Sequence, residues 1–471
     1  MANKEEKSKT AILKEEILMK KNKGVKNISS EEIKKADEFC KGYVKFLDKS
    51  PMEREAVKYT VELAKANGFT EFDPDKKYNA GDKVYYVNRD KAIALAVIGK
   101  NGVKKGAKLA IAHLDSPRID LKPNPLYEQN DLALFKTHYY GGLKKYQWTA
   151  IPLTLHGTVV KLDGTKVDIC IGDDPSEPCF CITDLLPHLA QEQAQKPMAK
   201  VFTGEDLNVL VGSRPFETED EESDLVKLNV MSILNEKYGI TECDFLSSEL
   251  CLIPSFKTRD IGFDRSMIGG YGHDDKVCAY PALMAAVDAE VPENTCITYL
   301  CDKEEIGSDG NTGMQSDFLR FFIYDLAEAD GIQGYRALSL SNCLSAVVNA
   351  AFDPTYPSVY EANNCSYLNH GVIISKYTGH GGKYDTSDAS AEYMGEVRAM
   401  LENNDIMWQV GELGKVDQGG GGTIAKYVAN MNVDVVDLGV PVLSMHAPME
   451  VVSKLDVYMA YRAFKVFFEQ K

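Results

Sequence analysis

CITYLCDKEEIGS, residues 296–308, joins a short apolar run to a cluster of charged side chains. The run Cys296–Leu300 has the length of a buried β-strand, and Glu304 and Glu305 follow shortly after it. Ligands of an open α/β sheet collect outside the carboxyl ends of its strands, so these acids are candidates for a functional site. One of two adjacent glutamates can coordinate a metal while the other accepts a proton from water. Adjacent acids are more often a solvated pair, so this interpretation needs support elsewhere in the chain.

Two histidines follow apolar runs in the same way. His113 and Asp115 come directly after Lys108–Ala112, and His446 lies at the end of the run Val440–Met445. In an H-x-D triplet the imidazole can bind a metal while the carboxylate holds and polarises the ring. A single triplet of this kind more often contains a histidine with only a structural role.

A pair of aspartates precedes another apolar stretch. Asp274 and Asp275 stand just before a segment, Val277 onward, that we expect to be helical. A single Asp in this position is commonly a helix N-cap. Paired aspartates could instead let one carboxylate bridge two cations. Together with the two histidines and two glutamates, they match the ligands of a two-metal hydrolytic site, whose ions lie about 3.5 to 4 Å apart.

Length and charge limit the class of protein. The chain has 471 residues, of which 44% are hydrophobic, and its 53 Lys and Arg against 70 Asp and Glu give a net charge of −17. At about 100 to 200 residues per domain, this length predicts two or three folded domains. The negative charge argues against nucleic acid and anionic membranes as partners, because both require a positive surface.

The cysteines and the N-terminal segment favour the cytoplasm. The eleven cysteines form no CxxC pair, so we expect reduced, buried thiols without a zinc ribbon or a redox motif. The first residues mix charges and lack the apolar region of an export signal. No stretch approaches the ~20 apolar residues of a membrane helix.

The order of the predicted elements indicates an α/β protein. Strand-length runs such as Ala92–Ile98 and Ala337–Ala346 alternate with helical stretches such as Tyr280–Ala289. This predicts a mixed, largely parallel sheet with flanking helices. Residues 122–255 instead contain short alternating runs, which indicate an inserted β-rich domain. Residues 1–121 and 256–471 would then form one discontinuous α/β domain.

Six motifs resemble, in sequence and order, those of the aspartyl aminopeptidase and aminopeptidase I family of cocatalytic zinc peptidases. The likeness extends over roughly residues 80 to 460. The motifs are His-Leu-Asp-Ser-Pro-Arg (113–118), Asp-Asp-Lys-Val-Cys (274–278), Asp-Lys-Glu-Glu-Ile-Gly-Ser (302–308), Thr-Ser-Asp-Ala-Ser-Ala-Glu (386–392), Gly-Gly-Gly-Gly-Thr-Ile (419–424) and Ser-Met-His-Ala-Pro (444–448).

The resemblance implies a ligand set for two Zn²⁺ ions per subunit. His113 and His446 would each bind one ion, Asp274 would bridge the two ions, and Glu305 would complete the His446 site. Co²⁺ and Mn²⁺ accept the same ligand set, so the sequence does not select the metal.

The resemblance also implies catalytic roles and an assembly. Glu304 would be the general base, and Asp115 would orient His113. The inserted segment would be a dimerisation and lid domain. The assembly would be a homo-oligomer, a tetrahedral dodecamer built from dimers, with enclosed active sites.

One residue departs from the family pattern. Family members carry Ser-Ala-Asp-Val-Asn where this chain has Ser-Ala-Val-Val-Asn at residues 345–349, and that Asp binds the ion of the H-x-D histidine. Val347 stands in its place, so we expect the His113 site to be weak or empty. Asp353 is the nearest acid along the chain, but a turn would have to interrupt the strand for it to replace the missing ligand.

Other features carry weaker signals. Gly422 ends a glycine run that lacks the Lys of a phosphate loop; it is a flexible turn or, by the resemblance, part of the substrate pocket wall. Lys383 could supply a cation for an acidic N-terminal side chain, although a lysine in a Gly-rich loop is usually only solvated. Five histidines have no second ligand at metal spacing, and we expect structural or surface roles for them: His138, His156, His188, His370 and His380.

We therefore expect metal-dependent removal of single N-terminal residues from peptides. Glu304 would act as the base, and acidic Asp or Glu at the N-terminus is the candidate preference. Val347 favours one alternative, a one-metal or inactive peptide-binding member of the same fold. The other alternative is a different two-metal hydrolase, such as a carboxypeptidase or deacylase.

Overall fold

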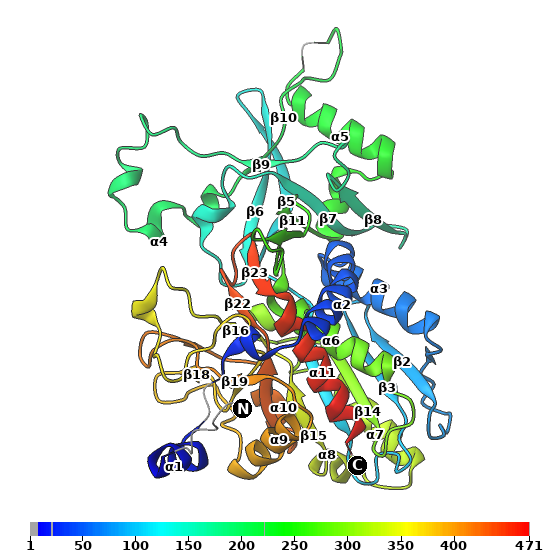
Figure 1. The fold of residues 1–471 in the computed structure, drawn as a ribbon. Helices are drawn as coiled ribbons and strands as arrows, with labels where there is room; N and C mark the ends of the chain where they lie inside the picture. Colours follow the sequence, from blue (N-terminus) through cyan, green and yellow to red (C-terminus); the bar gives the residue numbers. More distant parts are fainter. Residues whose placement is uncertain (1–7, 20–21, 221, 471) are drawn as a thin grey trace.

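A nine-stranded sheet forms the centre of this computed structural model, which describes residues 8–19, 22–220 and 222–470 (Figure 1). Its strands β14, β4, β15 and β21 run parallel, whereas β3 and β17 flank these four antiparallel. The expected mixed α/β fold is therefore confirmed. In spatial order the strands are β1 (Thr70–Glu71), β2 (Lys83–Asn88), β3 (Ala92–Val97), β14 (Cys296–Cys301), β4 (Lys108–His113), β15 (Asn342–Ser345), β21 (Asp434–Gly439), β17 (Val372–Ser375) and β19 (Trp408–Val410).

Helices cover both faces of this sheet. Alternate side chains of a strand point to opposite faces, so Ala110 and Ala112 of β4 lie in one apolar core and Leu109 and Ile111 in the other. Burial on both faces explains why the central strands are almost continuously apolar. The first core contains α2 (Ser30–Lys49), α3 (Glu53–Ala66), α6 (His273–Asp288), α9 (Ala391–Asn403) and α11 (Lys454–Glu469), and the second contains α7 (Phe318–Ala329), α8 (Gly334–Ser339) and α10 (Ala425–Ala429).

A second, antiparallel sheet is built from residues 118–254 and lies above the first in Figure 1. It has its own core around Phe135, Trp148 and Phe245, and α4 (Met198–Val201) and α5 (Leu225–Tyr238) belong to the same segment. In spatial order its strands are β8 (Lys166–Ile171), β7 (Leu153–Val160), β11 (Ser248–Pro254), β5 (Arg118–Gln129), β6 (Leu132–Tyr140), β10 (Val209–Gly212) and β9 (Cys181–Ile182).

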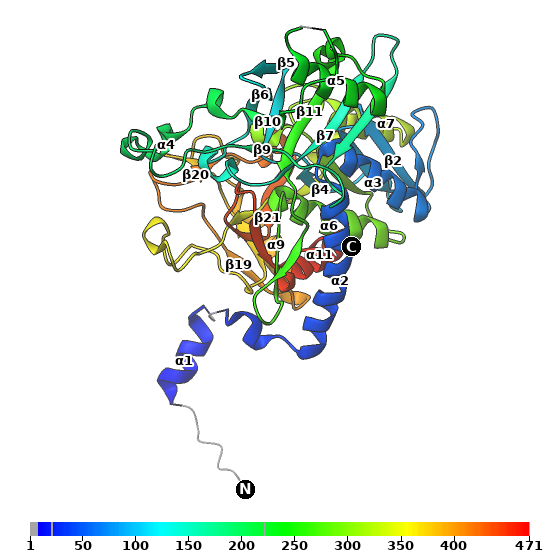
Figure 2. The ribbon, with the colours of Figure 1, turned by 90° about the horizontal axis from the view of Figure 1, so that it is seen from above.

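Two smaller sheets and the first helix complete the described fold. The helix α1 (Lys9–Ile17) buries none of its residues and lies apart from the sheets in both views (Figures 1 and 2). Among the described residues, no helix has the length and apolar character needed to cross a bilayer. The small sheets consist of β12 (Arg259–Ile261), β13 (Met267–Gly270), β23 (Glu450–Ser453), β22 (Pro441–Leu443) and β16 (Asn349–Ala350), and of β18 (Gly379–His380) with β20 (Gly420–Gly421).

Two of the apolar runs expected to be strands have other bounds or other pairing partners in the structure. The run Ala337–Ala346 is divided between the end of α8 and the four-residue strand β15. The run Val440–Met445 leaves the main sheet after β21 and pairs as β22 in the five-stranded sheet. An apolar run predicts that a segment is buried, but it does not predict the sheet in which that segment pairs.

Helix α11 provides a test of the core. Phe464 is fully buried between α11 and the sheet, so Phe464→Ala should lower the free energy of unfolding by about 3 to 5 kcal/mol. The neighbouring Lys465 has a side chain that is 38% exposed. Lys465→Ala should therefore change the free energy of unfolding by about 0.5 kcal/mol or less. Urea unfolding followed by circular dichroism measures both. Equal effects of the two substitutions would contradict the described packing of α11.

Candidate metal centre

Side chains from four separate segments meet at the carboxyl ends of β4 and β14. His113 ends β4, and Glu304 and Glu305 open a short 3₁₀ helix just after β14. These segments are adjacent because β4 and β14 pair in parallel register up to His113 and Cys301. Asp274 comes from the first turn of α6, and His446 follows β22.

The Asp274 carboxylate lies between the two histidines. Its Oδ1 is 3.2 Å from His113 Nε2, and its Oδ2 is 3.1 Å from His446 Nε2. Each carboxylate oxygen therefore faces a different imidazole. This is the arrangement required of a carboxylate that bridges two cations.

The two glutamates flank this bridge. Glu304 Oε2 lies 3.8 Å from His113 Nε2, and Glu305 Oε2 lies 3.5 Å from His446 Nε2. We call the group of His446, Asp274 Oδ2 and Glu305 the His446 seat, and the group of His113 and Asp274 Oδ1 the His113 seat. The first has three protein ligands and the second has two, although a donor oxygen of Glu305 also lies within 4.8 Å of donor atoms of His113 and Asp274.

Asp115 supports both sides of the His113 seat. His113 Nδ1 is 3.0 Å from the backbone carbonyl of Asp115 and 3.2 Å from its Oδ1, so a proton on Nδ1 leaves Nε2 facing Asp274. The Asp115 carboxylate also accepts the backbone N–H groups of Glu304 and Glu305, each at 3.1 Å. It therefore positions the glutamates as well as the histidine, an arrangement common around ligating histidines.

A turn of the inserted segment, residues 140–142, also reaches this centre. The Tyr140 hydroxyl donates to Asp115 Oδ2 at 2.9 Å, and His446 Nδ1 donates to the carbonyl of Gly142 at 2.7 Å. Gly141 has φ +76°, and a Cβ there would lie 3.2 Å from Cβ of Glu305, so glycine suits both the backbone and the space. Sequence analysis missed these contacts because no local pattern links this turn to the strand ends.

Two more buried acids hold the ligands in place. Glu450 on β23 accepts the backbone N–H of His446 at 2.7 Å through Oε1 and that of Asp274 at 3.0 Å through Oε2. Asp275 accepts the His113 backbone N–H at 3.3 Å. Sequence analysis did not identify Glu450, and its position four residues after His446 is the signal that could have.

The crowding of acids shifts their protonation. Burial raises the pKa of Glu304 to about 7; His113 opposes this rise, and Asp274 adds to it. Burial, followed by the charge of Asp274, raises the pKa of Glu305 well above its usual range. For His446, burial favours a lower pKa, but the Asp274 hydrogen bond and the Glu305 charge raise it to about 10. Such a group of carboxylates is stabilised by added positive charge.

These residues fit a divalent cation. Glu305 Oε1 is buried and has no hydrogen-bond partner among the described residues. Such an oxygen carries an energetic penalty unless something binds it. Imidazole nitrogen and carboxylate oxygen are also the donors that Zn²⁺ accepts. The His446 seat, which includes Glu305, therefore offers more donor groups to a cation than the His113 seat does.

Val347 replaces the further ligand that was expected for the His113 seat. It follows β15, two residues beyond Ser345, which is the last residue of that strand and pairs with Ile111 on β4. Its side chain belongs to the apolar core of α7, α8 and α10. Asp353 does not replace the ligand, because its carboxylate accepts the Thr355 N–H in its own turn, 2.8 Å away.

The two expected substrate-binding residues, Lys383 and Gly422, lie just after β18 and β20, which pair as a two-stranded ribbon. Lys383 Nζ pairs with Asp388 at 2.9 Å and lies 3.9 Å from the ring centre of Tyr377. Gly422 packs against the backbone of Asp385, where a Cβ would find the carbonyl at 3.4 Å. Their roles stay predictions.

Comparisons with known proteins identify the family of this chain. Residues 46–468 match the family model of the aminopeptidase I zinc metalloproteases, M18. A probable M18 family aminopeptidase 1 of Borrelia garinii is 45% identical over 96% of this chain and 100% of its own length. The crystal structure of an M18 aminopeptidase from Thermotoga maritima has a TM-score of 0.91 at 44% identity, covering 96% and 100% of the two chains. The S. cerevisiae mApe1 dodecamer, 20% identical with a TM-score of 0.74 over 93% and 97%, shares the fold.

Glu305→Gln tests the His446 seat. The amide keeps the size of the side chain but removes its charge, so Zn²⁺ affinity should fall by at least about tenfold. Calorimetric titration of metal-free protein measures the affinity. Glu217→Gln, an exposed glutamate of the inserted segment, is the matched control and should leave the affinity unchanged. Equal affinities of the two variants would contradict the assigned seat.

Proposed function

Because this chain belongs to the M18 aminopeptidase I family and is therefore a zinc-dependent aminopeptidase, we propose that it removes single N-terminal residues from peptides with Glu304 as general base. The position of Glu304 supports this role most directly. Its carboxylate lies beside the His113 seat, and its backbone N–H is held by Asp115. A pKa of about 7 suits a group that must take up and return a proton near neutral pH.

The proposed reaction divides the work among the residues of this centre. Asp274, Glu305 and His446 would hold zinc, which when bound acts as a Lewis acid and makes water more acidic. Glu304 takes a proton from the attacking water as the water oxygen bonds to the scissile carbonyl carbon. The C–N bond then breaks, and Glu304 returns the proton to the leaving amine. The family assignment favours this reaction over carboxypeptidase or deacylase chemistry.

We assign the selection of an acidic N-terminal side chain to Lys383. A substrate carboxylate would compete with Asp388 for the ammonium group, and the Tyr377 ring would keep the lysine in place. The backbone at Gly422, just after β20 of the same ribbon, would line the substrate pocket.

We infer that residues 122–255 form a dimerisation and lid domain on a metallopeptidase domain of residues 1–121 and 256–471. The contacts of the 140–142 turn with Asp115 and His446 support a role of this segment in completing the centre. The dodecamer of the yeast protein with this fold supports a homo-oligomer of twelve subunits, built from dimers. The eleven free cysteines, which include the exposed Cys170, Cys179 and Cys243, support a cytoplasmic location.

Val347 favours a second candidate function within the same family. With two protein ligands, the His113 seat would bind its ion weakly, and the protein would act with one Zn²⁺ or serve as a peptide-binding member of the fold. Two Zn²⁺ per subunit is the expectation for the family, with Co²⁺ and Mn²⁺ as substitutes.

Glu304→Gln separates binding from catalysis. Turnover of a peptide with a free N-terminus should fall by about 10² to 10⁴, because the amide cannot take a proton. Zinc content should stay as in the wild type, since the His446 seat does not include Glu304. Peptide hydrolysis and elemental analysis measure the two quantities. An unimpaired rate rules out the assigned base, and equal cleavage of an N-acetylated peptide rules out an aminopeptidase.

Val347→Asp tests the missing ligand. The new carboxylate should strengthen binding of the second Zn²⁺ by about tenfold or more and raise turnover at limiting zinc. Calorimetric titration resolves the two ions. Val347→Asn is the matched control, because it has a similar volume and no charge. If the wild type binds two ions as tightly as Val347→Asp does, the valine is not the cause of a weak seat.

A further inference from the structure

A second cluster of metal-binding side chains lies in the inserted segment and shares no residue with the centre described above. His156 on β7, Cys170 on β8 and Asp173 just after β8 bring one donor atom each within 4.8 Å of one another. His156 was expected to have only a structural role because no ligand stands near it in sequence. The antiparallel pairing of β7 and β8 makes His156 and Cys170 cross-strand partners.

The spacing of the donor atoms suits a tetrahedral ion. His156 Nε2 is 3.1 Å from Asp173 Oδ1 and 4.0 Å from Cys170 Sγ. Around tetrahedral zinc with ordinary bond lengths, such atoms lie about 3.4 to 3.6 Å apart. These two distances would have to change by about half an ångström or less, and Cys170 Sγ lies within 4.8 Å of the Asp173 donor oxygen.

A carboxylate behind the histidine selects the nitrogen that faces the cluster. Glu55, on α3, accepts from His156 Nδ1 at 2.9 Å, and its other oxygen accepts the backbone N–H of Met52 at 3.2 Å. With a metal bound, a proton held on Nδ1 by Glu55 would leave the Nε2 lone pair for the ion. Ligating histidines typically have such a partner, which also makes the ring a better donor.

The local charge is appropriate for a cation. His156 is 1% exposed and has carboxylates on both ring nitrogens. A divalent ion would bind among these negative groups in place of a proton, and Lys257, 3.1 Å from Asp173 Oδ2, is the cation with which it would compete.

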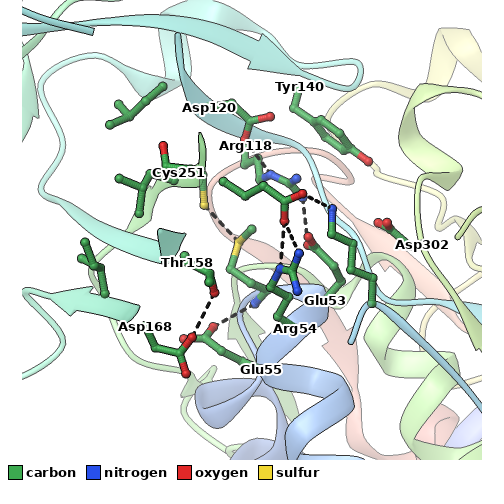
Figure 3. Close-up of a pocket in the computed structure, with 18 of the residues that line it drawn as sticks. Glu53, Arg54, Glu55, Arg118, Asp120, Tyr140, Thr158, Asp168, Cys251 and Asp302 are labelled. Atoms are coloured by element: carbon green, nitrogen blue, oxygen red, sulfur yellow. Dashed lines mark hydrogen bonds and ion pairs between the residues drawn. The ribbon is translucent and has the colours of Figure 1, made fainter. Parts of the chain in front are cut away.

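An ion can reach the cluster from solvent. Cys170 is exposed, and together with Glu55 it lines a pocket of about 510 Å³ between α3 and the inserted sheet. Figure 3 labels Glu55 and Asp168 among the residues that line this pocket, and Asp168 accepts from Thr158 at 3.0 Å. Among the three proposed ligands, Cys170 lines this opening and is the one that an entering ion would meet first.

We propose that His156 Nε2, Cys170 Sγ and Asp173 Oδ1 bind a divalent cation of the zinc type, with water as the fourth ligand. One thiolate, one imidazole and one carboxylate form a donor set that favours Zn²⁺ over Mg²⁺ or Ca²⁺. The ion would join β7 to β8, and its ligand His156 bonds to Glu55 on α3, a helix outside the inserted segment. The site would therefore stabilise the contact between the inserted segment and α3.

Cobalt substitution tests the proposal independently of peptidase activity. The full-length protein loaded with Co²⁺ should show a thiolate-to-cobalt charge-transfer band in the near ultraviolet. Co²⁺ at the first centre gives no such band, because none of its ligands is a cysteine. Cys170→Ser should lose the band. Cys179→Ser, which changes another exposed cysteine of the same segment, is the matched control and should keep it.

Zinc content provides a second measurement. After equilibration with Zn²⁺ and gel filtration, the wild type should retain roughly one more ion per chain than His156→Asn, with circular dichroism verifying the fold. The absence of the band in the wild type overturns the proposal, as does its persistence in Cys170→Ser or its loss in Cys179→Ser. Equal zinc contents of wild type and folded His156→Asn also overturn it.

Discussion

The carboxylate of Asp274, held between two imidazoles, is the constraint on which the centre depends. Its oxygens lie 3.2 Å from His113 Nε2 and 3.1 Å from His446 Nε2. Two histidines more than three hundred residues apart can meet one aspartate only if the strand ends are adjacent. The parallel pairing of β4 with β14, and the first turn of α6 packed at their ends, provide this. Charges of the same sign gathered there are tolerated because a cation can bind among them.

The inserted segment takes part in this centre as well as in its own sheet. Tyr140 bonds to the aspartate that orients His113, and Gly142 accepts a hydrogen bond from His446. Arg118 stacks on Tyr140 at 3.9 Å and pairs with Glu53 and Asp120 in the pocket of Figure 3. A movement of this segment would therefore change the orientation of both histidines. The proposed site at His156 would restrain that movement through Glu55.

Under the proposed ligand assignment, Val347 would change the chemistry without changing the fold. Its side chain fits the apolar core of α7, α8 and α10, so the sheet is preserved. It supplies no charged oxygen, so the His113 seat would depend on the shared Asp274 and a single imidazole. Packing depends on volume and apolar surface, whereas metal affinity depends on the number and charge of donor atoms.

The amino-acid order alone was enough to predict the mixed α/β fold and the residues that meet at the first centre, because apolar runs mark buried strands and the polar residues after them mark strand ends. It did not reveal that Val440–Met445 pairs outside the main sheet, and it missed Glu450, Tyr140 and the partners of His156. Apart from the contact of Glu450 with His446, four residues before it, those contacts join segments with no local pattern in common. They arise only when the β7 and β8 strands pair, the inserted sheet packs on α3, and its 140–142 turn reaches the strand ends, since hydrogen bonds and metal ligands depend on distance in space and not on distance along the chain.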